Sequence, residues 1–344
     1  MDLKEIYLTS LARCAPDVLV QRHIDASMPR NIVAIGKCAG ALLDGVARVH
    51  DIAHAFVAIP EGYRLPSTHA QIHIGGHPQM TRASFDAGRA LLDFVDAHDD
   101  LLFLVSGGGS ACIEVPLAPH SEDEVAQRNA ELIASGLPIG AINAERKKVS
   151  AIKGGRLGNR VRGRAITLVY SDVATHHLHD VASGPTRPDI LIADNTTLVQ
   201  TAASLIGDRA VMLDQQIECD VDEAAQMLAT HAERLRAGEI LVAGGEPTVT
   251  LRGNGKGGRC SELAARFSTI SQREALFASS DGVDGNSGVA GIYLARNRNA
   301  ADRAEVQAAL AVSDSFRIAA QVGEPIMIAA AGNNLRDLFL VARD

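Results

Sequence analysis

The chain has 344 residues, enough for about two domains, and 47% of them are hydrophobic, so it can bury a sizeable core. Its formal net charge of −8 argues against a nucleic-acid-binding protein, which needs a basic surface. Its apolar runs fall short of the ~18 residues that span a membrane. The five widely spaced cysteines predict free thiols and a cytoplasmic protein.

Short apolar runs alternate with helical patterns in the first half of the chain. After an amphipathic N-terminal helix, buried strands are expected at residues 31–36, 55–60, 71–76, 101–109 and 165–172. Helical patterns follow the first strand and precede the fourth, at residues 40–50 and 83–98. Most of these strands are apolar on both faces, which is typical of a parallel sheet covered by helices on both sides.

The second half of the chain begins with helical patterns and then returns to strands. Residues 194–236 are mostly helical, and a new block starts after Gly238. Strands are expected near residues 239–244, 248–251, 275–282 and 325–332. We therefore predict an N-terminal Rossmann-like α/β domain over residues 1–237 and a second α/β domain over residues 238–344.

Three strands of the first half end in small or polar residues: "GKCAG", "SGGGSA" and "SDVA". Ligands of open α/β sheets bind beyond the carboxyl ends of the strands, so these endings predict one shared site. The glycines suit close approach to a phosphate. The "SGGGSA" turn is neither a dinucleotide fingerprint nor a P-loop, and a purely structural turn is the alternative. Lys37 could neutralise a phosphate or be a solvated charge.

Positive charge is concentrated in "NAERKKVSAIKGGRLG", residues 143–158 of an acidic chain. Such a cluster suits a carboxylate or polyphosphate, and a solvated helix face is the alternative. A second glycine-rich loop ends at Arg259, whose planar donor fork also suits phosphate. His77, between Gly-Gly and Pro, is the histidine expected near a site.

The segment "SDVATHHLHDVASGPTRP" carries His176, His177 and His179 beside Asp172 and Asp180. Imidazole and carboxylate groups are transition-metal ligands. The H-H-x-H spacing matches no standard zinc site, however, and solvated loop histidines are the favoured interpretation.

The motifs, taken in order, resemble the glycerate 2-kinase family, whose C-terminal region is called MOFRL. They are "AIGKCAG", "GGHP", "VSGGGSA", "INAERKKVSAIKGGRLG", "YSDVA", "VASGPTRPD", "GGEPTVTLRGNGKGGR", "SSDGVDG" and "GNNLRDL", and they span nearly the whole chain. Some members of the family are labelled hydroxypyruvate reductases. The resemblance implies two α/β domains with the active site in the cleft between them. It also implies phosphorylation of the 2-hydroxyl of D-glycerate, with ATP and Mg²⁺ as cofactors.

The resemblance also implies roles for individual residues. Lys37 and Arg259 would contact phosphate, Asp172 would bind metal or position the hydroxyl, and Asp281 would be a further metal ligand. The cofactor-binding set would be Ser106, Gly107, Gly108, Gly109, Ser110, Ser183, Gly184, Thr186, Gly245 and Glu246. The substrate-binding set would be His77, Asn143, Arg146, Lys147 and Lys153.

The chain also departs from the family pattern. Residues 175–177 are Thr-His-His where the family usually shows Gly-Asp-Asp, Thr81 and Arg82 replace an acidic pair, and Gly288 replaces an aspartate. A kinase acting on a small hydroxy acid is the first hypothesis. A nucleotide- or phosphoester-binding relative with a regulatory or other non-kinase role is the second. A transition-metal hydrolase using Asp172 and the histidines is the third. A reductase is disfavoured because no dinucleotide fingerprint is present. A homodimer is left open.

Overall fold

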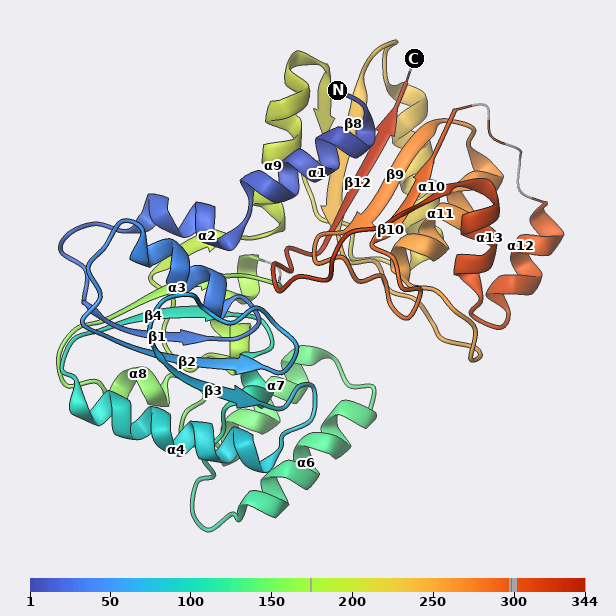
Figure 1. Cartoon of the computed structure of the whole chain (residues 1–344). Coiled ribbons are helices and arrows are strands. Elements are labelled where there is room, and N and C mark those ends of the chain that lie inside the picture. Colours follow the sequence, from blue (N-terminus) through green and yellow to red (C-terminus); the bar gives the residue numbers. More distant parts are fainter. Residues whose placement is uncertain (174, 297, 299–301, 344) are drawn as a thin grey trace. The chain divides into compact units, whose positions relative to one another are not determined.

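The computed structural model describes residues 1–173, 175–296, 298 and 302–343. The chain divides into two compact units, each built around one six-stranded sheet. The first unit is continuous and comprises residues 15–194. The second unit combines residues 1–14 with residues 195–344 (Figure 1).

The sheet of the first unit is entirely parallel, with the strand order β3-β2-β1-β4-β5-β6. This is the strand order of a doubly wound sheet. Successive strands are added on one side of β1 as far as β3 and then, from β4 onward, on its other side. The order confirms the predicted α/β fold and the five predicted strands, and it adds β6. The strands are β1 (Asn31–Ile35), β2 (His54–Pro60), β3 (Gln71–Gly75), β4 (Leu101–Ser106), β5 (Ala165–Tyr170) and β6 (Ile190–Ala193).

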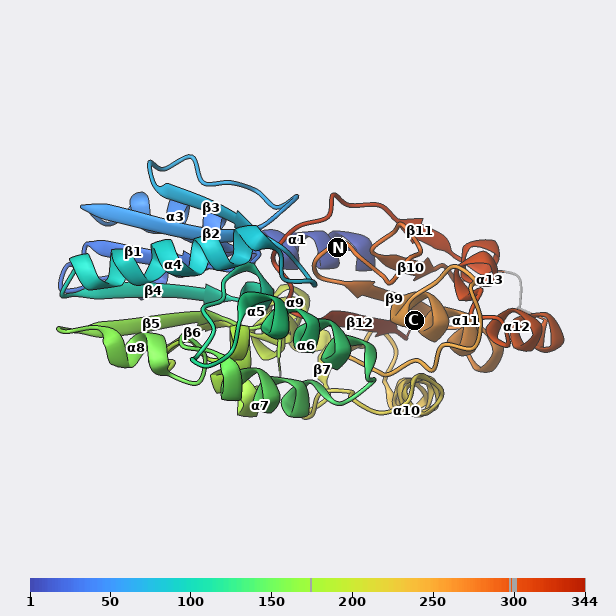
Figure 2. The same ribbon diagram turned by 90° about the horizontal axis from the view of Figure 1, so that it is seen from below.

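Helices cover both faces of this sheet, with α3 on one face and α4 on the other (Figures 1 and 2). The amphipathic α4 buries Phe85, Leu91 and Phe94, and Thr81 and Ser84 form a capping box at its start. The helices of the unit are α2 (Pro16–Leu19), η1 (Val20–His23), α3 (Ala39–Ala47), α4 (Arg82–Ala97), α5 (Gly109–Cys112), α6 (Glu122–Ala134), α7 (Ile139–Val149), α8 (Arg156–Arg160) and η2 (Thr175–Ser183).

The sheet of the second unit is mixed, with the order β11-β10-β9-β12-β8-β7, and only the β7–β8 pair is parallel. Its strands are β7 (Ala210–Met212), β8 (Ile240–Gly245), β9 (Glu274–Ser279), β10 (Gly291–Leu294), β11 (Glu324–Ile326) and β12 (Asp337–Ala342). The strand predicted at 248–251 is wrong, because only Thr248 forms an isolated bridge, to Asp220. The strand predicted at 325–332 ends at Ile326.

The helices of the second unit are α1 (Leu3–Arg13), α9 (Asn195–Ile206), η3 (Gly207–Arg209), α10 (Val221–Arg234), α11 (Arg259–Ile270), α12 (Arg303–Leu310) and α13 (Ser315–Val322). The N-terminal α1 packs on α9, and the buried Tyr7 hydroxyl donates to the Ser279 carbonyl at 2.6 Å. Because α9 packs on β8 and α10 on α11, residues 195–237 also belong to this unit. The compact units therefore divide the chain differently from the predicted boundary at residues 237/238.

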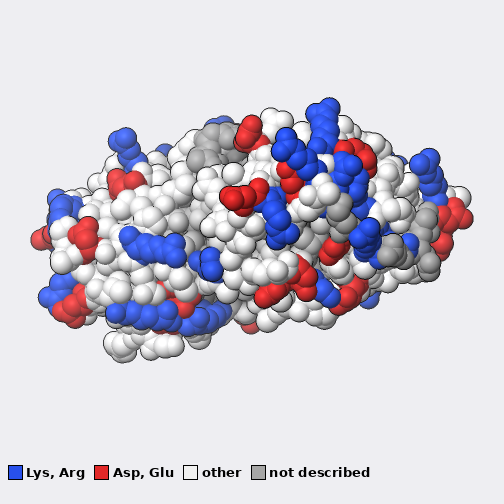
Figure 3. Space-filling model, turned by 90° about the horizontal axis from the view of Figure 1, so that it is seen from above, with Lys and Arg blue, Asp and Glu red and all other residues white. Residues whose placement is uncertain are grey.

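The surface carries charges of both signs. On the face in Figure 3, basic and acidic side chains lie interspersed, as expected from ion pairs such as Arg48–Asp17 at 2.9 Å. All five cysteines are free thiols. Among the described residues, no helix combines the length and the apolar character that crossing a bilayer requires.

Candidate functional site

A pocket of about 320 Å³ opens in the first unit beyond the carboxyl ends of β4 and β5. This is the edge of the sheet at which ligands of doubly wound folds bind. The β4–α5 turn contributes Gly107, Gly108, Ser110 and Ala111, and the end of β5 contributes Asp172 and Val173. The remaining lining residues are His77, Pro78, Ile133, Ile139, Ile142, Asn143, Arg146, Asp180, Val181, Ala182 and Ser183.

The ends of β1 and β4 are joined by hydrogen bonds that shape the glycine-rich turn. The Cys38 N–H donates to Ser106 Oγ at 3.0 Å, and the Lys37 N–H donates to the Gly107 carbonyl at 2.9 Å. Gly108 has a φ of +81°, which favours glycine, and a Cβ there would lie 2.7 Å from Lys37 Cγ. The Lys37 side chain therefore crosses the turn that forms one wall of the pocket.

Gly107 allows the Asp172 carboxylate to lie directly against the turn. A Cβ on Gly107 would overlap both carboxylate oxygens of Asp172. The absence of a side chain at residue 107 thus sets the position of Asp172, and the predicted proximity of these two strand endings is present in the structure.

Arg146 on α7 is a buried cation, with 9% of its surface exposed. Its Nε donates to Asn129 Oδ1 at 2.9 Å, and its Nη1 makes a long contact of 3.5 Å with Asn143 Oδ1. Among the described residues, no carboxylate forms an ion pair with its guanidinium; burial lowers its pKa, and the more distant charge of Glu114 opposes this shift. Because a buried charge without a directly contacting counter-ion is costly, the geometry favours an anionic ligand beside Arg146.

A chain of polar side chains connects Arg146 with the glycine-rich turn. Ser183 Oγ donates to Asn143 Oδ1 at 2.8 Å and shares a hydrogen bond of 2.6 Å with Ser110 Oγ. Ala182, Ser183 and Gly184 all have left-handed backbone, with φ of 53°, 61° and 62°. Such conformations cost non-glycine residues about 1–3 kcal/mol each and are common at functional sites. They hold Ser183 at the pocket wall.

His77 lies exposed at the pocket. Partial burial, followed by the positive charges of Lys37 and Arg146, lowers its pKa from 6.5 to about 4. The imidazole is therefore neutral at pH 7, and the charges of Lys37 and Arg146 add to the effect of burial.

We expect an NMR titration of His77 to give a pKa near 4 in the free protein and a higher value when a carboxylate or phosphate fills the pocket, because the anion offsets the charges of Lys37 and Arg146. Between pH 6.5 and about 4 the unfolded chain takes up a proton that the folded chain does not. Stability should therefore fall as the pH decreases through this window, and His77→Gln should remove that contribution. A His77 pKa that stays near 6.5 in both the free and the ligand-bound protein would contradict this account.

Two lysines predicted to bind substrate form ion pairs instead. Lys147 Nζ contacts Asp180 Oδ1 at 2.6 Å at the edge of the pocket. Lys153 and Glu114 form a pair with only 1% of each side chain exposed, and Glu114 also accepts from Ser150 Oγ at 2.5 Å. Lys153 does not line the pocket, so the structure differs from the prediction: its charge is neutralised inside the core.

The remaining predicted cofactor-binding residues of this unit support the pocket without lining it. Ser106 and Gly109 belong to the β4–α5 turn, and Gly184 packs against the carbonyl of His179. The Thr186 hydroxyl is buried and has no hydrogen-bond partner among the described residues. These positions remain predictions.

Two predicted residues of the second unit, Arg259 and Glu246, belong to an ion-pair network with Asp337. Arg259 donates to Asp337 Oδ2 and Oδ1 at 3.1 and 3.2 Å, and to Glu246 Oε1 at 2.7 Å. Burial raises the pKa of Asp337 to about 6, although the charge of Arg259 opposes this shift. Three N–H groups of Arg259 thus donate to carboxylates, and a phosphate-contacting role of Arg259 remains a prediction.

Two further predicted residues of the second unit also have internal partners. Gly245 has a φ of +149° and packs on the Ile217 backbone. Asp281 Oδ1 accepts from Ser279 Oγ at 2.6 Å and from the Val283 N–H at 3.0 Å. A metal-binding role of Asp281 remains a prediction.

Sequence reasoning missed Asn129 and the apolar wall of the pocket. Asn129 is 2% exposed and orients Arg146 from α6. It shares a helix face with Val125 and Ile133 at i, i+4 and i+8 spacing. A polar residue on an otherwise apolar helix face is the sequence feature that could have identified Asn129. Ile133, Ile139 and Ile142 supply the apolar wall.

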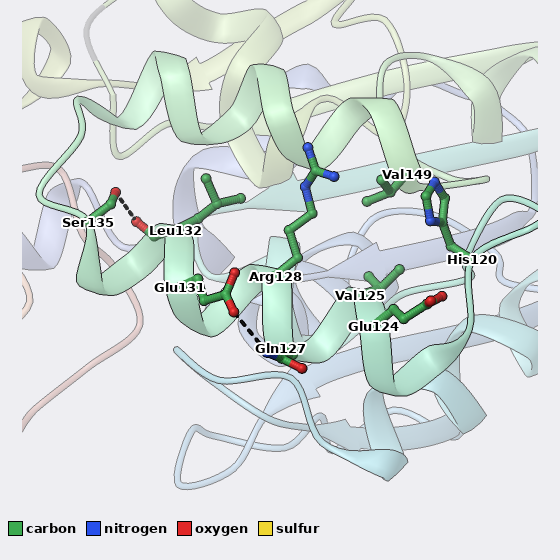
Figure 4. A pocket seen from close by; sticks show the side chains of 9 residues that line it. All are labelled: His120, Glu124, Val125, Gln127, Arg128, Glu131, Leu132, Ser135 and Val149. Atoms are coloured by element: carbon green, nitrogen blue, oxygen red, sulfur yellow. Dashed lines mark hydrogen bonds between the residues drawn. The ribbon is translucent and has the colours of Figure 1, made fainter.

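A second hollow, of about 570 Å³, lies along α6 and is lined by none of the predicted residues (Figure 4). Gln127 donates to Glu131 at 2.9 Å, and Arg128 pairs with Glu145 on α7 at 2.6 Å. Several of its polar side chains thus have partners within the protein.

The first unit is therefore a doubly wound α/β fold with an anion-favouring pocket at its strand ends, and it is joined to a second α/β unit. Residues 2–217 match the model of a domain of unknown function, DUF4147, and residues 239–337 match the MOFRL family. The chain belongs to the DUF4147 family and carries a MOFRL region after it. This confirms the resemblance that the motifs predicted.

The chain is similar to several glycerate kinases. It is 27% identical to the D-glycerate 2-kinase of Thermotoga maritima, over 98% of each chain. It is 29% identical to the glycerate 2-kinase of Sulfurisphaera tokodaii, over 77% of this chain and 78% of that one. A crystal structure of glycerate kinase from Thermotoga maritima superposes with a TM-score of 0.89, covering 99% of this chain and 98% of that chain.

Proposed function

We propose that the protein is a glycerate 2-kinase, a phosphotransferase that moves the γ-phosphoryl group of ATP to the 2-hydroxyl of D-glycerate or a closely related hydroxy acid. The observation that carries the proposal is the buried Arg146, which lacks a carboxylate partner among the described residues and faces a pocket of about 320 Å³. That volume suits a small ligand. The glycerate kinase relatives support the same reaction.

In this proposal Arg146 and Asn143 hold the substrate carboxylate. Arginine presents a planar set of donors that matches a carboxylate, and its fixed position on α7 would orient the acid. Ser183 and Ser110, which are hydrogen-bonded to each other at 2.6 Å, offer hydroxyl groups to the polar end of the ligand. The hydroxy acid would then be oriented before the reaction.

The glycine-rich turn and Lys37 would hold the transferring phosphate. Phosphoryl transfer requires mainly in-line positioning and neutralisation of charge on the phosphoryl oxygens. During the step the hydroxyl oxygen bonds to the γ-phosphorus, the bond from phosphorus to the ADP oxygen breaks, and the hydroxyl proton is released to solvent. Lys37, whose side chain crosses Gly108, would neutralise that charge.

The Mg²⁺ that accompanies ATP fits the residues of the pocket, because Mg²⁺ prefers carboxylate and other oxygen ligands. Asp172 would hold it, since its carboxylate lies on the turn and lines the pocket. When bound, the ion would supply charge neutralisation on the phosphates. The five free thiols are consistent with the proposed cytoplasmic location.

The test is ATP consumption on a panel of hydroxy acids, comparing the unaltered chain with Arg146→Met. We expect D-glycerate to be converted to 2-phosphoglycerate. The variant should raise KM for the acid by about 10- to 100-fold, because a hydrogen bond to a charged group contributes about 1.5–3 kcal/mol. KM for ATP should change little. Arg128→Met is the matched control, because Arg128 pairs with Glu145 and does not line the pocket.

If no acid on the panel consumes ATP while nucleotide still raises the melting temperature, the kinase proposal is wrong. The alternative of a nucleotide-binding relative with another role would then hold. An unchanged KM for the acid in Arg146→Met would instead contradict only the role given to Arg146.

Gly107→Ala should lower turnover by about 100-fold while the protein stays folded. The new Cβ would displace the Asp172 carboxylate, and a shift of about 1 Å in a positioning group can cost that much. The melting temperature should change little, because the displaced group is the end of a side chain. Gly140→Ala is the control, since a Cβ at this α7 position meets open space. Full turnover in Gly107→Ala would show that the position of Asp172 is unimportant.

A further inference from the structure

The η2 segment brings together two histidines and an aspartate that the proposed kinase reaction does not use. Asp180 Oδ2 lies 3.6 Å from His177 Nδ1 and 3.5 Å from His179 Nε2. The three ligand atoms all lie within 4.8 Å of one another. The transition-metal hydrolase hypothesis named Asp172 together with the histidines, whereas the structure brings Asp180 beside His177 and His179. The side chain of His176, also named in that hypothesis, lies outside the described residues.

The two separations from Asp180 Oδ2 are close to the spacing of ligands around one small metal ion. A tetrahedral ion with bonds of about 2.0–2.1 Å to nitrogen and oxygen holds its ligands roughly 3.3–3.4 Å apart. Hydrogen bonds between nitrogen and oxygen are shorter, at about 2.7–3.2 Å. The observed 3.5 and 3.6 Å lie closer to the metal spacing.

We propose that His177, His179 and Asp180 bind one divalent transition-metal ion of the zinc class. Two imidazoles and a carboxylate are a ligand set that zinc and its neighbours favour, whereas Mg²⁺ prefers oxygen ligands alone. Three protein ligands leave the fourth position for water. This site is distinct from the oxygen ligands assigned to the Mg²⁺ that accompanies ATP.

The surroundings of Asp180 favour this arrangement. Lys147 binds the other carboxylate oxygen, Oδ1, at 2.6 Å, so that Oδ2 is directed toward the two imidazoles. Such a partner behind a ligating carboxylate is typical of metal sites. The side chains of His177 and His179 are 52% and 66% exposed, which gives the ion a path from solvent.

The ion would lie next to the pocket and fix one of its walls. Asp180 lines the pocket, and its carbonyl accepts a long hydrogen bond of 3.5 Å from Asn143 Nδ2. Asn143 in turn accepts from Ser183. Binding of the ion would thus hold the start of η2 to the residues proposed to orient the acid.

The experiment is a Co²⁺ titration of the full, untagged chain after treatment with a chelator. We expect one Co²⁺ per chain, with the visible absorption of a tetrahedral ion, displaced by Zn²⁺ and not by excess Mg²⁺. His179→Ala and His177→Ala should each weaken Co²⁺ binding by more than about 100-fold, because even indirect ligand partners contribute 10- to 100-fold. His120→Ala, at another exposed histidine, should leave binding unchanged.

Two results would overturn the proposal. One is the absence of stoichiometric Co²⁺ binding, which would leave His177 and His179 as ordinary ion-pair partners of Asp180. The other is equal Co²⁺ affinity in His179→Ala and the unaltered chain. Because the readout is metal binding, the result does not depend on whether the protein phosphorylates glycerate.

Discussion

Turnover is expected to fall by roughly 30- to 1,000-fold when Lys37 is replaced by alanine, which corresponds to about 2–4 kcal/mol of barrier. Lys37 follows β1 at the point where the sheet order reverses, and its N–H is fixed by the Gly107 carbonyl at 2.9 Å. Its side chain crosses Gly108, and Nζ lies 5.7 Å from the centre of the Tyr63 ring. A positive charge held there stabilises the phosphoryl oxygens as the transferring group separates from ADP.

Initial rates with saturating ATP and D-glycerate measure this effect. Lys148→Ala is a suitable control, because Lys148 is 63% exposed and pairs only with Glu145 among the described residues. The control should keep full turnover. If Lys37→Ala also keeps full turnover, Lys37 has no role in neutralising the phosphate.

The second large effect concerns stability. Lys153→Met is expected to lower the free energy of unfolding by about 3–5 kcal/mol, because it leaves the carboxylate of Glu114 buried without its cation. Both side chains of this pair are 1% exposed, and in the variant Glu114 would keep its hydrogen bonds to Ser150 and to the Val115 N–H. Urea denaturation followed by circular dichroism measures the loss.

The exposed Lys148–Glu145 pair serves as a control for the buried Lys153–Glu114 pair. Lys148→Met breaks the exposed Lys148–Glu145 pair and should cost less than about 1 kcal/mol. The double variant Lys153→Met with Glu114→Gln should regain part of the stability lost in the single variant, because no unpaired charge stays buried. A loss below 1 kcal/mol in Lys153→Met would show that Glu114 is neutral or solvated.

Much of the first unit could be predicted because its strands are continuously apolar. β4 is buried at every position, and such runs are typical of parallel sheets covered on both faces. The alternating residues 248–251 predicted a strand that does not form, because the neighbouring segment offers only one bridge, at Asp220. The membership of α1, α9 and α10 in the second unit depends on packing between distant segments, which local patterns do not encode.

Local sequence patterns also fail to assign the individual charged residues of the site. Arg146 and Lys153 belong to one basic run in the sequence, yet one faces the pocket and the other is buried beside Glu114. Lys153 follows the end of α7, so helical spacing does not determine its direction. Its partner lies 39 residues earlier in the chain. Charge counting could find the cluster but could not assign its members.

The N-terminal helix also has a consequence for how the chain is synthesised. α1 leaves the ribosome before α9 and β9, on which it packs and which belong to the part of the chain that begins at Asn195. At about 5–20 residues per second, the helix waits roughly 10–50 s for these partners. During that interval Leu3, Ile6 and Tyr7, which are buried in the finished protein, remain uncovered, while residues 15–194 can already fold. The nascent chain therefore presents the apolar face of α1 to chaperones until α9 and β9 have been synthesised.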